Sequence, residues 1–206
     1  MMPWFRAPFL AKYYFPGMWN GAKDKVYLTF DDGPHATITP WVLSILEKHQ
    51  IKATFFCVGE NIKKNAAVFK EIQDQGHLVG NHTFEHLKGR KTNNTVYCES
   101  VEKTEKMTQT KLFRPPYGSI KKTQLTWLKK LGFTVVFWSW LSHDFNKKTT
   151  PKSILQASSR VKGGDILVFH DSAKAETNLK ATLESIIEQL LSRGFSFDVL
   201  PIRNTP

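Results

Sequence analysis

KVYLTFDDGPH, residues 25–35, begins as an apolar, β-favouring strand and ends in two adjacent aspartates followed by a Gly-Pro turn. On an extended backbone, neighbouring side chains point to opposite faces. Asp31 and Asp32 are therefore expected to have separate tasks, one binding a metal ion and the other facing a substrate. In the alternative interpretation, one aspartate caps the turn at Gly33 and Pro34 while the other is merely solvated.

Strand-like and helical patterns alternate along the chain on both sides of this stretch. Strands are predicted over 25–30, 53–58, 78–80, 112–114, 134–140, 165–170 and 195–200, and helices over 39–49, 66–75, 95–107, 123–131, 151–161 and 178–193. Such alternation favours parallel strands covered by helices, as in a doubly wound sheet or a (β/α) barrel.

The positions of the polar residues separate these two folds. Aspartate, histidine, arginine or tryptophan follows five of the predicted strands, and in a barrel these strand ends meet at one mouth. The chain is also shorter than a typical eightfold barrel of about 250 residues. We therefore predict an α/β fold, a distorted or incomplete (β/α) barrel with about seven parallel strands.

Length and composition indicate one domain over residues 1–206. The net charge of +11, from 29 basic and 18 acidic residues, favours an anionic partner or simply a solvated surface. Basic residues form no block of five or six, and no nucleic-acid-binding motif is present, so we expect no nucleic-acid partner. The two cysteines, Cys57 and Cys98, do not make a disulfide framework in a chain of this length.

The first 23 residues differ from the rest in being rich in aromatic side chains. Arg6, Lys12 and three prolines interrupt their apolar residues, so we expect neither a clear signal peptide nor a transmembrane segment. The segment is predicted to pack on or beside the barrel; contact of its Trp and Tyr residues with a membrane interface is the alternative. A monomer is expected.

The sequence NHTFEH places His82 and His86 four residues apart, so that both imidazoles can reach one ion if the segment forms a helical turn. Glu85 directly precedes the second histidine, which distinguishes the motif from the HExxH of metalloproteases. Two histidines with an aspartate make a three-ligand site that leaves a position open for water. These donors suit zinc, with cobalt, nickel or manganese as alternatives. Alone, a pair of histidines four residues apart more often faces solvent or forms hydrogen bonds within the core than binds a metal.

Two further motifs carry candidate functional groups. In RPPYG, residues 114–118, Arg114 can bind a carboxylate with two hydrogen bonds, and the prolines restrict the direction of the Tyr117 N–H. In VFHD, residues 168–171, His170 ends a buried strand and is a candidate proton donor. In isolation, each also fits a purely structural role.

Taken in order, TFDDGP, NHTFEH, RPPYG, FWSWLSHDF and LVFHD resemble the five motifs of the polysaccharide deacetylases, carbohydrate esterase family 4, which contain the NodB-homology domain. The resemblance covers residues 24–199. It implies a distorted (β/α) barrel that uses a divalent metal, commonly zinc, to remove acetyl groups from N-acetylated or O-acetylated sugars.

The resemblance also implies a role for each matching residue. Asp31 would be the general base, Asp32 a metal ligand together with His82 and His86, and His170 the acid that protonates the leaving amine. Arg114 would orient the base, and the Tyr117 N–H would help to stabilise the oxyanion. The remaining matches, expected to form an apolar wall against the substrate, are Trp138 and Leu167.

The fourth motif departs from the family pattern. Many members carry an aspartate four residues before a tryptophan, whereas here those positions are Leu141 and Phe145. The missing carboxylate would have supported the arginine and the catalytic histidine. Asp144, Ser139 or Asp171 is expected to replace it, and activity and pH optimum are expected to change more than the reaction class.

Substrate and location are the least determined features. The first expectation is an acetylated polysaccharide or oligosaccharide with N-acetylglucosamine units, in peptidoglycan or a chitin-like oligomer, attacked by metal-bound water. The alternatives are an O-deacetylase of acetylated xylan and a non-catalytic sugar-binding protein on the same fold. A glycan substrate favours the cell envelope, periplasmic or extracellular.

Overall fold

The computed structural model describes residues 5–7 and 9–201. Its central sheet is parallel throughout, with the strand order β5-β4-β3-β2-β1-β7-β6, and an additional strand, β8, pairs with β1. The strands are β1 Lys25–Asp31, β2 Thr54–Cys57, β3 Leu78–Asn81, β4 Leu112–Phe113, β5 Thr134–Val135, β6 Trp140–Leu141, β7 Ile166–His170 and β8 Ser196–Phe197.

The order of the strands shows why the sheet curls. Its two edge strands, β5 and β6, are joined only by residues 136–139. Five residue steps from Val135 to Trp140 span at most about 18 Å, whereas seven strands laid flat would separate the two edges by about 29 Å. The sheet must therefore bend until its edges approach each other, which confirms the predicted incomplete barrel.

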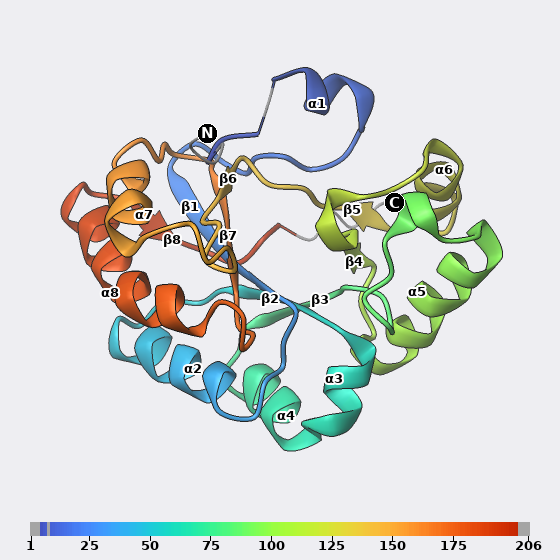
Figure 1. The fold of residues 1–206 in the computed structure, drawn as a ribbon, viewed down its shortest axis with the longest axis horizontal. Coiled ribbons are helices and arrows are strands. Elements are labelled where there is room, and N and C mark those ends of the chain that lie inside the picture. Colours follow the sequence, from blue (N-terminus) through green and yellow to red (C-terminus); the bar gives the residue numbers. More distant parts are fainter. Residues whose placement is uncertain (1–4, 8, 202–206) are drawn as a thin grey trace.

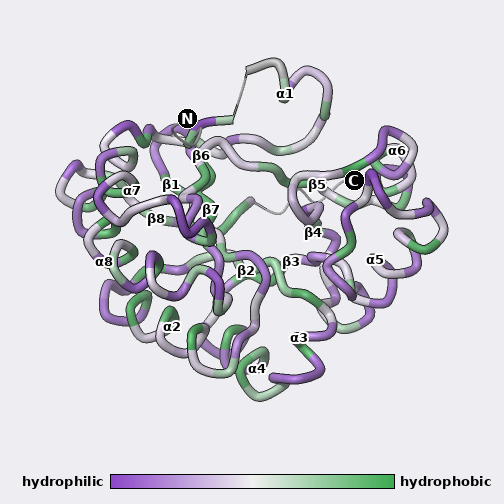
Figure 2. The backbone as a smooth tube through the Cα atoms, in the orientation of Figure 1, coloured by the Kyte–Doolittle hydropathy of each residue, from purple (hydrophilic) through white to green (hydrophobic). Residues whose placement is uncertain are grey.

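The helices surround the strands, as Figure 1 shows. Their bounds are α1 Phe9–Tyr14, α2 Ile38–Lys48, α3 Gly59–Lys64, α4 Ala66–Asp74, α5 Asn94–Thr108, α6 Lys122–Lys130, α7 Pro151–Ser158 and α8 Glu176–Ser192, with short 3-10 turns at Gly89–Lys91 and Pro116–Gly118. Hydrophobic and hydrophilic colours alternate along α2, α4 and α8 in Figure 2, as expected for helices that bury one face. No helix among the described residues is long and apolar enough to cross a membrane.

The N-terminal segment lies along the two edges of the curled sheet. The Leu141 N–H donates to the carbonyl of Phe5, and the Met18 N–H donates to the carbonyl of Val135. These bonds connect one segment to both β6 and β5, so it bridges the two sheet edges. Helix α1, between the two attachments, lies over this side of the molecule (Figure 1).

Two sequence-based predictions of secondary structure are corrected by the structure. The predicted strand over 134–140 is two short strands on opposite edges of the sheet, because residues 136–139 carry the chain from one edge to the other. The short helix α3 was not predicted. Its sequence, GENIKK, is polar and spans less than two full turns, so it has no clear amphipathic period.

Candidate active site

Five strands bring polar residues to one cavity of about 240 Å³ at their carboxyl ends. Seven of the nine residues predicted for the site line it: Asp31, Asp32, His82, His86, Tyr117, Trp138 and His170. Four more residues that the sequence analysis did not assign to the site also line the cavity: Leu141, Phe145, Val168 and Lys174. The barrel therefore gathers residues that lie up to 143 positions apart in the sequence, from Asp31 to Lys174.

Asp31 and Arg114 form a buried ion pair beside the cavity. The Arg114 Nη1–H donates to Asp31 Oδ1 over 2.6 Å, and the Arg114 side chain is fully buried. The same Nη1 donates to Thr29 Oγ1, and Nη2 donates to the carbonyl of Phe137. The guanidinium carbon lies 4.1 Å from the centre of the Phe56 ring. These contacts hold the guanidinium in one orientation and present Asp31 to the cavity as a paired carboxylate.

Replacing Arg114 by an uncharged residue would leave the Asp31 carboxylate without its partner, and Asp31 is only 4% exposed to solvent. Arg114→Met is therefore expected to lower the free energy of unfolding by about 3–5 kcal/mol. Urea denaturation measures the loss, with Arg160→Met, at an exposed arginine, as a control expected to stay within about 0.5 kcal/mol. In the double variant Arg114→Met/Asp31→Asn, part of the stability should return. An Arg114→Met protein as stable as the control would show that the pair is not structurally important.

Asp32, His82 and His86 form a second cluster in the same cavity. Asp32 Oδ1 lies 3.0 Å from His86 Nε2 and 3.8 Å from His82 Nε2. One ligand atom from each residue lies within 4.8 Å of the other two. Burial raises the pKa of Asp32, but the hydrogen bond from His86 and the nearby histidines outweigh it, so the net pKa is lowered. Asp32 is therefore an ionised carboxylate at neutral pH.

His82 is held in the form that a metal ligand requires. Its Nδ1 lies 2.8 Å from the carbonyl oxygen of Arg114, which can only accept, so Nδ1 carries the proton and Nε2 keeps its lone pair. Burial lowers the pKa of His82 to about 4, so the ring is neutral at physiological pH. Neutral imidazole with Nε2 directed to a carboxylate and a second imidazole fits a divalent cation, and zinc suits this donor set.

The local backbone that assembles this cluster is not the one predicted. Residues 82–86 form no helical turn; instead His86 has a left-handed φ of 56°, and its ring centre lies 5.1 Å from that of His82. Asp32 also departs from extended geometry, with φ 79°. Asp31 and Asp32 therefore both line the cavity rather than facing opposite sides of a strand. The Asn61 side chain, on helix α3, donates to the carbonyl of Asp32 and supports this turn.

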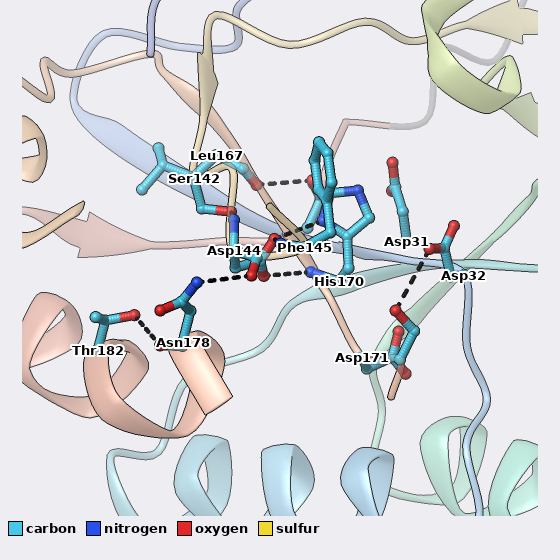
Figure 3. A network of polar contacts seen from close by, with 12 residues as sticks. Asp31, Asp32, Ser142, Asp144, Phe145, Leu167, His170, Asp171, Asn178 and Thr182 are labelled. Atoms are coloured by element: carbon cyan, nitrogen blue, oxygen red, sulfur yellow. Dashed lines mark hydrogen bonds and ion pairs between the residues drawn. The ribbon is translucent and has the colours of Figure 1, made fainter. Parts of the chain in front are cut away.

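His170 lies on the other side of the cavity and is paired with Asp144. Asp144 Oδ1 lies 2.7 Å from His170 Nδ1, and Oδ2 accepts the His170 backbone N–H. Figure 3 shows His170 between Asp144 on one side and Asp31 and Asp32 on the other. Burial lowers the pKa of His170, but Asp144 outweighs it and raises the pKa to about 9. Among the three replacements considered for the missing carboxylate of the fourth motif, Asp144 is the one that contacts this histidine.

The other two candidate replacements have different partners. The Ser139 hydroxyl donates to Asp165, and Asp171 accepts hydrogen bonds from the Gly33 N–H and the Thr39 hydroxyl. Burial raises the pKa of Asp171 to about 7. Asp171 thus supports the turn that follows Asp31 and Asp32.

One residue predicted for the apolar wall of the cavity, Leu167, does not line it. Leu167 is fully buried in the core, whereas Val168 lines the cavity. Side chains alternate along β7, so Val168 shares a face with His170 and Leu167 faces the opposite side. Trp138, as predicted, lines the cavity, and its ring lies over Gly118, where a Cβ would come within 2.8 Å of it. Phe145 contacts His170 edge-on, with ring centres 4.8 Å apart.

Comparison with known proteins gives one consistent result. The model of the polysaccharide deacetylase family matches residues 20–136. A peptidoglycan-N-acetylglucosamine deacetylase of Bacillus cereus is 35% identical over 196 residues, which cover 92% of this chain and 70% of that protein. A chitooligosaccharide deacetylase of Azorhizobium caulinodans is 29% identical over 199 residues, covering 87% of this chain and 94% of that protein.

A solved structure also resembles the whole described fold. The crystal structure of the Bc1960 peptidoglycan N-acetylglucosamine deacetylase, in complex with 4-naphthalen-1-yl-N-oxidanyl-benzamide, superimposes with a TM-score of 0.87. The two sequences are 33% identical, and the match covers 95% of each chain. At this level of identity and coverage, the likeness extends beyond the fold to the sequence of nearly the whole chain.

Proposed function

This chain belongs to the polysaccharide deacetylase family, and on that premise we propose that it removes the acetyl group from N-acetylglucosamine units of peptidoglycan or a chitin-like oligomer. The chain is a polysaccharide deacetylase acting on amide bonds. One observation carries the proposal: a carboxylate paired with arginine, a histidine paired with aspartate, and a three-ligand cluster all meet in one cavity.

The proposed metal site consists of Asp32, His82 and His86. A divalent cation held by these residues would supply an acidified water and a positive charge that polarises the acyl oxygen. The ionised Asp32 and the neutral His82 are the protonation states that such binding needs.

The chain's own groups then move two protons. Asp31, held by Arg114, accepts a proton from the attacking water as general base. His170 donates a proton to the nitrogen of the leaving amine, so that a neutral amine departs with acetate as the second product. In this scheme the Tyr117 N–H donates a hydrogen bond to the oxyanion. Leu141, Val168 and Trp138 form the apolar surface for the acetyl methyl group.

Asp144 acts in this scheme by keeping His170 protonated. With its pKa at about 9, the histidine remains a donor through neutral pH and loses its proton as pH rises through that value. Asp144→Asn is expected to move the alkaline limb of the kcat/KM profile down by roughly 1–3 pH units and to lower kcat on the order of 10²-fold. Glu184→Gln, at a surface ion pair on α8, is the control. An unshifted alkaline limb would remove Asp144 from this role.

The substrate class is tested by identifying the products. We expect peptidoglycan and N-acetylglucosamine oligomers to yield acetate and new primary amines in equal amounts. Acetylated xylan, an ester, can yield acetate without amine. Release from xylan alone would replace the proposed amide substrate with an ester, and binding of the oligomers without any release would indicate a sugar-binding protein.

A further inference from the structure

The catalytic cavity has two neighbouring cavities with which it shares walls, directly or in turn. Tyr117 and Trp138 line both the catalytic cavity and a second cavity of about 220 Å³. Ala11 and Phe15 line both this second cavity and a third of about 500 Å³. A row of three cavities, each sharing lining residues with the next, therefore extends from the reacting groups, past helix α1, to the start of α6. We call its part outside the catalytic cavity the N-terminal groove, bounded by Ala11, Phe15, Trp19, Arg90, Lys121 and Lys122.

The wall contributed by the N-terminal segment is attached at both ends. Besides the bonds to β5 and β6, the Ala7 N–H donates to the carbonyl of Ser139. The Arg6 guanidinium pairs with Asp165, which is buried. The Trp19 indole N–H donates to the carbonyl of Phe15 and so ties the end of the segment together. The groove is thus part of the folded framework.

Aromatic rings form the lining of the groove next to the catalytic cavity. Trp19 stacks on Phe137 with ring centres 4.4 Å apart and an angle of 12° between the planes. Phe15 packs against the same Phe137 ring. The C–H faces of sugar rings are apolar and pack against such flat surfaces, while the sugar hydroxyls stay in water. A row of aromatic rings leading from the catalytic cavity suits further units of a glycan strand.

The far end of the groove is positively charged. Arg90 and Lys122 are exposed, and the Arg90 guanidinium carbon lies 5.6 Å from the centre of the Phe15 ring. Lys88 lies over the ring of Tyr117, which lines both the catalytic cavity and the second cavity. The described residues lining the two outer cavities include no aspartate or glutamate. The groove therefore favours a strand that carries negative charge.

From the adjacency of these cavities, their aromatic lining and their charge, we propose that the N-terminal groove binds the sugar units adjoining the one being deacetylated and selects strands that carry carboxylates. The occupant is an acidic acetylated glycan, as in peptidoglycan strands, rather than a neutral chitin-like oligomer. The proposal rests on the proposed function and narrows its substrate. Phe15 and Trp19 supply packing area, and Arg90 and Lys122 supply the charge preference.

The test compares kcat/KM for soluble peptidoglycan strands, for the same strands with their carboxylates converted to neutral amides, and for the N-acetylglucosamine dimer. For Arg90→Gln/Lys122→Gln, we expect the ratio of strand to dimer kcat/KM to fall roughly three- to tenfold. With the unaltered protein, converting the strand carboxylates to amides should lower the ratio of strand to dimer kcat/KM by a similar factor. Lys152→Gln, at an exposed lysine on α7, is the matched control and should leave the ratio unchanged.

Two further measurements separate packing from charge and binding from turnover. Phe15→Ala should lower kcat/KM for charged and neutralised strands equally, chiefly through KM. Calorimetry of strand binding to Asp31→Asn should show weaker binding when Arg90 and Lys122 are also replaced. The proposal would be overturned if the ratio of strand to dimer kcat/KM were the same in the unaltered protein and in Arg90→Gln/Lys122→Gln. If no glycan releases amine but strand binding still depends on Arg90 and Lys122, the proposed reaction is wrong and the proposed binding role of the groove is retained.

Discussion

Asp31→Asn is expected to lower kcat for acetate release by about 10²–10⁴-fold, the usual contribution of a general base. Asparagine has nearly the same shape but cannot accept a proton at neutral pH. The side chain can still accept the hydrogen bond from Arg114 Nη1, so the fold around it should persist. Rates with N-acetylglucosamine oligomers at saturating concentration measure the effect.

The metal content of the same variant provides its internal control. Asp31 is not among the three grouped ligands, so Asp31→Asn should retain the same amount of divalent metal as the unaltered protein. Asp198→Asn, at a carboxylate outside the cavity that pairs with Lys25, controls for loss of an aspartate elsewhere. Near-normal turnover of Asp31→Asn would assign the base to another residue.

His82→Ala is expected to abolish retention of a divalent metal during dialysis and to lower kcat/KM by roughly 10²–10⁴-fold, because the several kcal/mol that a cation contributes would be lost. The reason is that His82 is buried, neutral and oriented by the carbonyl of Arg114, so no other residue can replace its Nε2 without rearrangement. Elemental analysis of dialysed protein measures the metal content directly.

A histidine outside the cavity serves as the comparison for this variant. His35 accepts hydrogen bonds from the N–H groups of Thr37 and Ile38, next to the start of α2, and does not line the cavity. His35→Ala should keep a full complement of metal. If His82→Ala also keeps one equivalent, His82 is not a ligand, and the proposed site must be redrawn around other donors.

The general fold was predictable because most of the strands and the longer helices have distinct hydrophobic patterns that alternate along the chain. The barrel was predicted from where the polar residues fall, at the ends of five strands. The division of 134–140 into two strands was not predictable from pattern. Six of the seven residues of TVVFWSW favour a strand, and only the closure of the sheet requires the chain to leave one edge and join the other.

The site was predicted less completely than the fold, for reasons visible in particular residues. Leu167 was expected from the resemblance to the family, whereas the alternation of side chains along a strand that ends at His170 places Val168 on the face of His170 and Leu167 on the opposite face. The left-handed backbone at Asp32 and His86 has no signal in the sequence, and Asn61, which supports Asp32, lies in a helix too short to be predicted. Asp144 could be named as a candidate replacement for the missing carboxylate because it lies in the fourth motif, next to Phe145. Only the fold shows that it contacts His170 Nδ1.

The central claim is that deacetylation depends on a divalent cation held by Asp32, His82 and His86. The most direct test measures acetate release from peptidoglycan by metal-stripped protein, before and after one equivalent of zinc is restored, alongside His82→Ala treated in the same way. We expect no release from the stripped protein, recovery with zinc, and no recovery for the variant. Equal release with and without metal, or no release from protein that has bound zinc, would contradict the account.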